Sequence, residues 1–251
     1  ETTHDRSVGI SLQKKPMPEF ESMLLITIAL ALVFDFSNGW HDSANAVATV
    51  VSTRVVSPFA AVIGAGVLNV AGAFMSTAVA KMVGSGIVDP ASVTQHMVAA
   101  ALAGAICWNL FTLLLGLPTS SSHALIGGMV GAAVTHGGWE TVKLTGLRSV
   151  LEAMVLSPFF GFAMGLALMV LISWLFFRVT RSVATRLFKR LQLISACFMA
   201  FSHGANDAQK SMGIITLALL SAGQIPSAEV PTCVIGACAL AMGLGTAAGG
   251  W

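Results

Sequence analysis

The chain has 251 residues, of which 55% are hydrophobic and only 10% are charged, with a net charge of +2. Soluble domains carry about 25% charged residues, so this composition excludes an ordinary soluble domain and indicates an all-α, polytopic membrane protein. The sequence contains no P-loop, GxSxG, HExxH or CxxC pattern, which argues against a hydrolytic or redox enzyme.

Uncharged segments of membrane-spanning length follow one another along the chain. They lie at 59–80, 90–139, 153–177, 211–228 and 230–251. A helix rises about 1.5 Å per residue, so about 20 such residues cross a hydrocarbon core roughly 30 Å thick. The expected helices cover about 22–36, 38–53, 58–82, 93–116, a segment restarting at Pro118, 152–177, 191–222 and 230–250.

The charge distribution divides the chain into four parts. Residues 1–21 form a polar N-terminal tail, and residues 22–177 form a first transmembrane repeat. Residues 178–190 contain five basic side chains and no acidic one, which predicts a cytoplasmic loop by the positive-inside rule and offers a second role in binding anionic lipid. Residues 191–251 begin a second transmembrane repeat.

A polar octet occurs twice within these apolar surroundings, as NGWHDSAN (38–45) and HGANDAQK (203–210). On a helix, the polar residues of each octet fall at positions i, i+3, i+4 and i+7 and form one stripe. They are Asn38, His41, Asp42 and Asn45 in the first octet and His203, Asn206, Asp207 and Lys210 in the second. The glycines Gly39 and Gly204 permit a helix break or a close backbone approach. This duplication predicts an inverted repeat with a site at the midplane, built from broken or re-entrant helices.

An aspartate inside a membrane helix costs about 2.5–3.5 kcal/mol on insertion scales, so intramembrane carboxylates are functional candidates. The alternative is that Asp42 pairs with Arg54 and Asp207 with Lys210, so that these charges only lock helices together. Asp35, near the end of the first expected span, is either functional or interfacial.

The element PTSSSH (118–123) adds hydroxyl groups at an expected helix start. Free N–H groups and the positive end of the helix dipole gather there, which suits a tetrahedral oxyanion. The serines could instead bond back to helix carbonyls and only pack. His123 is either a proton carrier or a packing residue, and the sequence leaves both open.

At these residues the sequence resembles the inorganic phosphate transporter (PiT) family, in its bacterial low-affinity Pit-like branch. The resemblance rests on GWHDSANA (39–46), PTSSSH (118–123) and GANDAQKS (204–211), which occur in the family's order. It implies secondary active transport, in this branch often by proton symport of phosphate complexed with a divalent metal. The sodium-coupled branch has Asn where His41 and Lys210 stand here, so protons are favoured over sodium.

The resemblance also implies roles for particular residues, with no resident metal or cofactor. The substrate oxygens would be bound by Asn45, Ser120, Ser121, Ser122, Asn206, Gln209 and Lys210. Coupling to the ion or proton would involve His41, Asp42, Asp207 and His123, and His41 could relay a proton or bind the co-transported metal.

Other readings remain open at this point. They are a sulfate or other oxyanion permease of the same family, a sodium-coupled phosphate symporter, an ion channel and an inert fragment. No second copy of PTSSSH follows the second octet, so the second repeat is read as incomplete and this chain alone is not expected to transport. The expected partners are inorganic phosphate and the lipid bilayer of a bacterial-type inner or plasma membrane, crossed several times. Nucleic acid is not expected, and a homo-oligomer is left open.

Overall fold

The computed structural model of the chain describes residues 18–89, 92–117 and 119–249, and these are almost entirely helical. The elements are α1 (Pro18–Ser52), α2 (Pro58–Ala73), α3 (Ala78–Ser85), α4 (Gln95–Leu114), α5 (Ser121–Gly137), the 3₁₀ turn η2 (Trp139–Thr141), α6 (Leu144–Phe176), α7 (Arg181–Ser221) and α8 (Thr232–Ala248). The all-helical fold expected from the composition is thereby confirmed.

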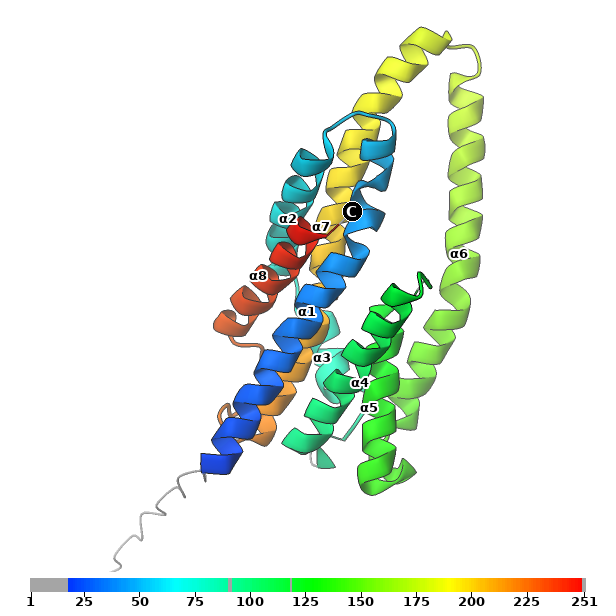
Figure 1. Cartoon of the computed structure of the whole chain (residues 1–251). Coiled ribbons are helices and arrows are strands. Elements are labelled where there is room, and N and C mark those ends of the chain that lie inside the picture. Colours follow the sequence, from blue (N-terminus) through cyan, green and yellow to red (C-terminus); the bar gives the residue numbers. More distant parts are fainter. Residues whose placement is uncertain (1–17, 90–91, 118, 250–251) are drawn as a thin grey trace, which may run out of the picture.

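Two long helices, α1 and α7, lie side by side at the centre and run in opposite directions (Figure 1). The shorter helices α8 and α2 pack beside them, with α8 mainly on α1 and α2 mainly on α7. Helices α4 and α5 form a second layer that reaches the centre mainly through the contact of α4 with α1. This arrangement places the two octets, one in α1 and one in α7, on facing helices.

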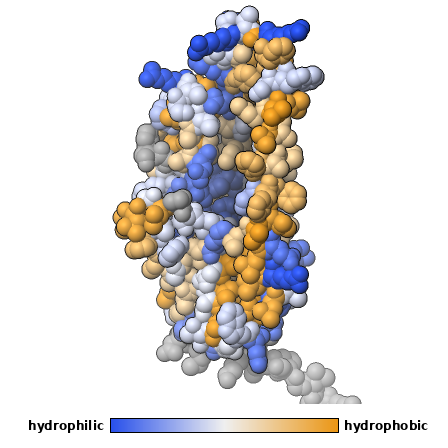
Figure 2. All heavy atoms as spheres, turned by 90° about the vertical axis from the view of Figure 1, so that its right-hand side faces the viewer, coloured by the Kyte–Doolittle hydropathy of each residue, from blue (hydrophilic) through white to orange (hydrophobic). Residues whose placement is uncertain are grey.

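Three of the described helices, α1, α4 and α6, are long and apolar enough to cross a membrane. Helix α6 stands apart from the central bundle (Figure 1), and Gly146 is the only buried residue described along its length. A helix that is apolar on all sides and exposed in this way fits a lipid environment. Figure 2 shows a hydrophilic hollow at mid-height on this side of the molecule, between hydrophobic surfaces.

Four glycines lie where the backbones of neighbouring helices touch. A Cβ atom at any of them would collide with a carbonyl oxygen of the facing helix. The contacts join Gly39 to Met242, Gly204 to Asn69, Gly72 to Phe201 and Gly245 to Phe36. Each contact in one half has an equivalent in the other half. Aligning the octets matches Phe36 with Phe201 and Gly39 with Gly204. Aligning Pro58 with Pro231 matches Asn69 with Met242 and Gly72 with Gly245.

The helix break expected between the segments 22–36 and 38–53 is wrong. Helix α1 is continuous through residues 36–38, and α7 is continuous through the second octet. Gly39 and Gly204 serve close approach of the backbones, which was the other possibility. A break occurs instead at residues 74–77, within the single helix expected over 58–82. There the Gln209 side chain accepts hydrogen bonds from the first N–H groups of α3, at 2.8 and 3.3 Å.

Most of the basic segment 178–190 is helical rather than a loop, because α7 begins at Arg181, and only residues 178–180 belong to the turn between α6 and α7. Arginine, lysine, leucine and alanine are strong helix formers, and their propensity outweighs the charge pattern there. Helix α6 begins at Leu144, earlier than the expected residue 152. The helix start expected at Pro118 lies outside the described residues, and α5 begins at Ser121.

We expect Gly72→Ala to destabilise the protein by about 1–3 kcal/mol, because the added methyl group would overpack the contact of α2 with α7. Gly64 lies on the same helix with no atom near its Cβ position. Gly64→Ala should therefore be neutral or stabilising by up to about 1 kcal/mol. Thermal unfolding of the two variants in detergent measures the difference. Equal stability of the two variants would contradict the close backbone contact.

Candidate functional site

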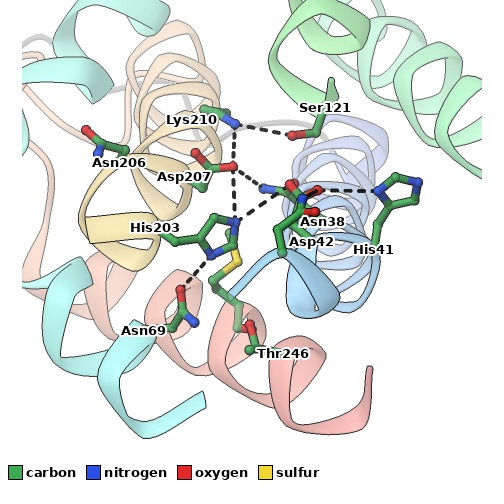
Figure 3. A network of polar contacts seen from close by, with 12 residues as sticks. Asn38, His41, Asp42, Asn69, Ser121, His203, Asn206, Asp207, Lys210 and Thr246 are labelled. Atoms are coloured by element: carbon green, nitrogen blue, oxygen red, sulfur yellow. Dashed lines mark hydrogen bonds and ion pairs between the residues drawn. The ribbon is translucent and has the colours of Figure 1, made fainter. Parts of the chain in front are cut away.

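The two octets meet where α1 and α7 face each other (Figure 3). The first polar residue of each octet reaches the aspartate of the other. The Asn38 Nδ2 group donates a hydrogen bond to Asp207 Oδ2 at 3.1 Å. His203 Nε2 lies 3.6 Å from Asp42 Oδ2. The stripes predicted from the sequence thus join into one polar network.

Asp207 is the carboxylate of this network that pairs with an ammonium group. Its Oδ2 atom accepts a hydrogen bond from Lys210 Nζ at 2.7 Å, in addition to the bond from Asn38. Lys210 is buried, and its Nζ atom also donates to Ser121 Oγ at 3.2 Å. The ammonium group therefore balances the charge of Asp207 and links the second octet to the serine-rich element at the start of α5.

Asp42 has histidines as its neighbours. Its Oδ1 atom lies 3.4 Å from His41 Nδ1 and accepts a bond from Asn45 Nδ2 at 3.3 Å. The pairing with Arg54 that simple helix locking requires is thus replaced by contacts with His41 and His203. Asp207 and Lys210 do pair, but both lie on α7, three residues apart, so this ion pair does not lock two helices together either.

The orientation of His203 is fixed by Asn69 of α2. The Asn69 amide donates to the carbonyl oxygen of Ala65 at 2.9 Å, so its Oδ1 atom faces His203 Nδ1 at 2.7 Å. His203 Nδ1 must then carry a proton, and Nε2 points between Asp42 and Asp207, 3.6 Å from an oxygen of each. A lone pair facing two carboxylates is unfavourable. Nε2 therefore suits either a second proton or a metal ion.

Asp42, His203 and Asp207 each offer one ligand atom, and these atoms lie within 4.8 Å of one another. Two carboxylate oxygens and an imidazole nitrogen form a donor set that divalent metal ions accept. The sequence analysis assigned no metal-binding group to His203, so this cluster became visible only when the helices were packed.

Three predicted site residues lie away from the network. Asn206 is exposed, bonds to the carbonyl oxygen of Ser202 and points away from the other octet (Figure 3). Gln209 is buried against the start of α3. His123 is exposed and lines a groove between α4 and α5 with Trp108.

The serines at the start of α5 have separate positions. Ser120 is the N-cap residue, and its hydroxyl accepts a hydrogen bond from the His123 N–H at 3.4 Å. Ser121 is buried and contacts Lys210, whereas Ser122 is half-buried. One hydroxyl therefore faces the octets beside the first turn of α5, where the free N–H groups and the positive end of the helix dipole lie.

Sequence reasoning did not select Asn69, Asn38 or His203 as site residues. The sequence did mark Asn69 as unusual, because it is the only strongly polar side chain between Pro58 and Met75. Asn38 and His203 are the first polar residues of the two octets, and their equivalent positions suggested paired roles. The cross-contacts that give them these roles depend on the packing of α1 against α7.

Comparisons with known proteins give one consistent result. A family model described as "Phosphate transporter family" matches residues 38–251. A probable low-affinity inorganic phosphate transporter of Rhizobium meliloti (strain 1021) is 47% identical over 231 residues, covering 91% of this chain and 69% of that protein. One of Bacillus subtilis (strain 168) is 45% identical over 235 residues, covering 91% of this chain and 71% of the relative.

A solved structure described as the sodium-dependent phosphate transporter has a similar fold. It superposes with a TM-score of 0.81 at 22% sequence identity, covering 89% of this chain and 74% of that structure. At this identity the likeness concerns the fold alone.

A double-mutant cycle can measure the Asp207–Lys210 contact. Lys210→Met leaves Asp207 without its ammonium partner, so adding Asp207→Asn should then cost less than it does alone. We expect a coupling energy of about 0.5–3 kcal/mol from thermal unfolding in detergent. The matched control is the exposed pair of Arg148 and Glu152, at 2.6 Å, where about 0.3–0.5 kcal/mol is expected. Equal coupling in the two pairs would contradict the partly buried setting of the Lys210 contact.

Proposed function

The chain belongs to the phosphate transporter family, and on that premise we propose that it is a proton-coupled secondary transporter. It is an inorganic phosphate transporter of the low-affinity, Pit-like kind and not an enzyme. The coupling ion, the form in which phosphate travels and the roles of the individual residues belong to the proposal.

Phosphate binds between the second octet and the start of α5. The observation that carries this assignment is the contact of Lys210 Nζ with Ser121 Oγ. It brings together an ammonium group, a hydroxyl group and the free N–H groups of a helix N-terminus, all of which attract a tetrahedral oxyanion. Ser120 and Ser122 flank Ser121, and Asn45 adjoins the network through Asp42. Substrate roles for Asn206 and Gln209 stay predictions from the sequence.

Coupling takes place at the carboxylates of the network. Asp42 lies between His41 and His203, and imidazole groups gain and lose protons near neutral pH. A proton on His203 Nε2 would be stabilised by both Asp42 and Asp207. The same cluster offers a place for the divalent ion of a metal–phosphate complex, as part of the cargo. The coupling role of His123 stays a prediction from the sequence.

The two octet-bearing helices form the core of an inverted repeat. The opposite directions of α1 and α7 (Figure 1) and the reciprocal glycine contacts support this assignment. The cross-contacts of Asn38 with Asp207 and of His203 with Asp42 support it at the site. In this arrangement each half supplies one wall of a midplane site.

The protein is a membrane protein with several candidate spans. Its place is a bacterial-type inner membrane, with the basic start of α7 on the cytoplasmic side. Whether it forms a homo-oligomer stays a prediction from the sequence.

Uptake of labelled phosphate into proteoliposomes tests the coupling ion. With the full-length protein, an imposed proton gradient should drive accumulation, whereas a sodium gradient alone should not. Accumulation driven by sodium would overturn proton coupling. A large excess of unlabelled sulfate should leave uptake unchanged, and strong competition would indicate a broader oxyanion permease.

We expect Asp42→Asn to abolish phosphate accumulation in the same assay, because the variant removes the negative charge shared by the two histidines. Glu152→Gln is the matched control, since Glu152 is a carboxylate of α6 outside the network. Uptake by Asp42→Asn at the rate of this control would remove Asp42 from the coupling mechanism.

A further inference from the structure

A third carboxyl group, Asp35, lies completely buried in the centre of the bundle, one helical turn before Asn38 in α1. Its Oδ1 atom accepts a hydrogen bond from Ser211 Oγ of α7 at 2.7 Å. Its Oδ2 atom has no hydrogen-bond partner among the described residues. None of the contacts of the octet network described above uses this group.

The surroundings of Asp35 hold few groups that could balance a negative charge. On α7, the charges of Lys210 and Asp207 act on Asp35, but Lys210 already donates to Asp207 and Ser121. On α8 the neighbouring group is the thiol of Cys238. Helix α2 contains no titratable residue, and both His96 and Cys107 of α4 are exposed. An ionised Asp35 would be an unpaired charge in an apolar interior, so the neutral acid is the form that this environment accepts.

Packing does not require a polar pair at this position. Aligning the octets pairs Asp35 with Ala200 and Ser211 with Ala46. Ala46 and Ala200 are both buried in the same apolar cluster at the other end of the α1–α7 contact. The equivalent position in the other half is thus closed by two methyl groups. The carboxyl group of Asp35 therefore has a purpose other than joining the two helices.

We propose that the coupled proton is stored on Asp35, and that the histidines and carboxylates of the octet network take it up and release it. This inference rests on the proton coupling proposed above. In the arrangement seen here the proton is held on the Asp35 carboxyl group. When the helices rearrange, the O–H bond breaks, the proton passes through the octet network to water, and the carboxylate that remains is balanced by Lys210, the residue next to Ser211. Bound phosphate also attracts Lys210, so phosphate occupancy favours the protonated form of Asp35 and the two are carried together.

Asp35→Asn tests the inference, because the amide keeps the size of the side chain and the acceptor for Ser211 but cannot release a proton. We expect the full-length variant to exchange labelled for unlabelled phosphate across proteoliposome membranes when both sides contain phosphate. Accumulation driven by a proton gradient should be lost completely. Thr27→Val removes another buried polar group of α1, a hydroxyl that donates to the carbonyl oxygen of Met23 in the same helix, and should behave as wild type.

The double variant Asp35→Ala/Ser211→Ala reproduces the pair found in the other half and therefore should fold. It should show the same loss of proton-driven accumulation with exchange retained. Infrared spectra give a readout that does not depend on transport, since a protonated carboxyl group has a C=O band that disappears in Asp35→Asn.

The outcomes separate this inference from the proposed function. Proton-driven accumulation by Asp35→Asn would overturn the role of Asp35. The same conclusion would follow if the variant lost both exchange and accumulation, or if its infrared spectrum kept the carboxylic acid band. A wild-type protein that responds only to sodium would overturn proton coupling itself, whatever the variants do.

Discussion

The interior of this protein is organised by the repulsion between Asp42 and Asp207, which approach the same histidine from facing helices. Charged groups are tolerated inside a membrane protein only where they are paired or hydrogen-bonded. Here Lys210 balances one carboxylate and His203 lies between the two, oriented by Asn69. The balance is incomplete unless His203 carries a second proton or a cation joins the cluster. A site that needs an additional positive charge is well suited to binding a proton or a metal cation together with an anionic substrate.

The reciprocal contacts depend on glycine at the crossing points. A methyl group at Gly39 or Gly204 would push α1 and α7 away from the helices behind them. The paired octets would then lose the geometry in which Asn38 reaches Asp207 and His203 reaches Asp42. The same four glycines thus support both the packing of the bundle and the arrangement of its polar centre.

Composition predicted the membrane helices, and the repeated octets predicted the polar stripe, because both depend on local sequence and helical periodicity. The family resemblance stated from the motifs is confirmed by the family match. Which stripe residues face the partner helix could not be predicted, since that depends on how α7 is rotated against α1. Asn206 and Lys210 belong to one stripe, yet only Lys210 faces the network. Charge alone suggested a loop at 178–190, where helix propensity decides the structure.

The contacts between glycine and carbonyl oxygen have a mechanical consequence. At these glycines the backbones of two helices touch, and few side chains there could change rotamer and let one helix slide past the other. The pairs α1–α8 and α2–α7 therefore move as rigid bodies. Helix α5 packs mainly on α4 and meets the second octet through the bond between Ser121 and Lys210. Opening of the proposed phosphate site is consequently a swing of the α4–α5 layer against the central helices. That swing breaks the bond between Ser121 and Lys210 and strains the bonds of Gln95 in α4 to Ala218 and Ser221 in α7.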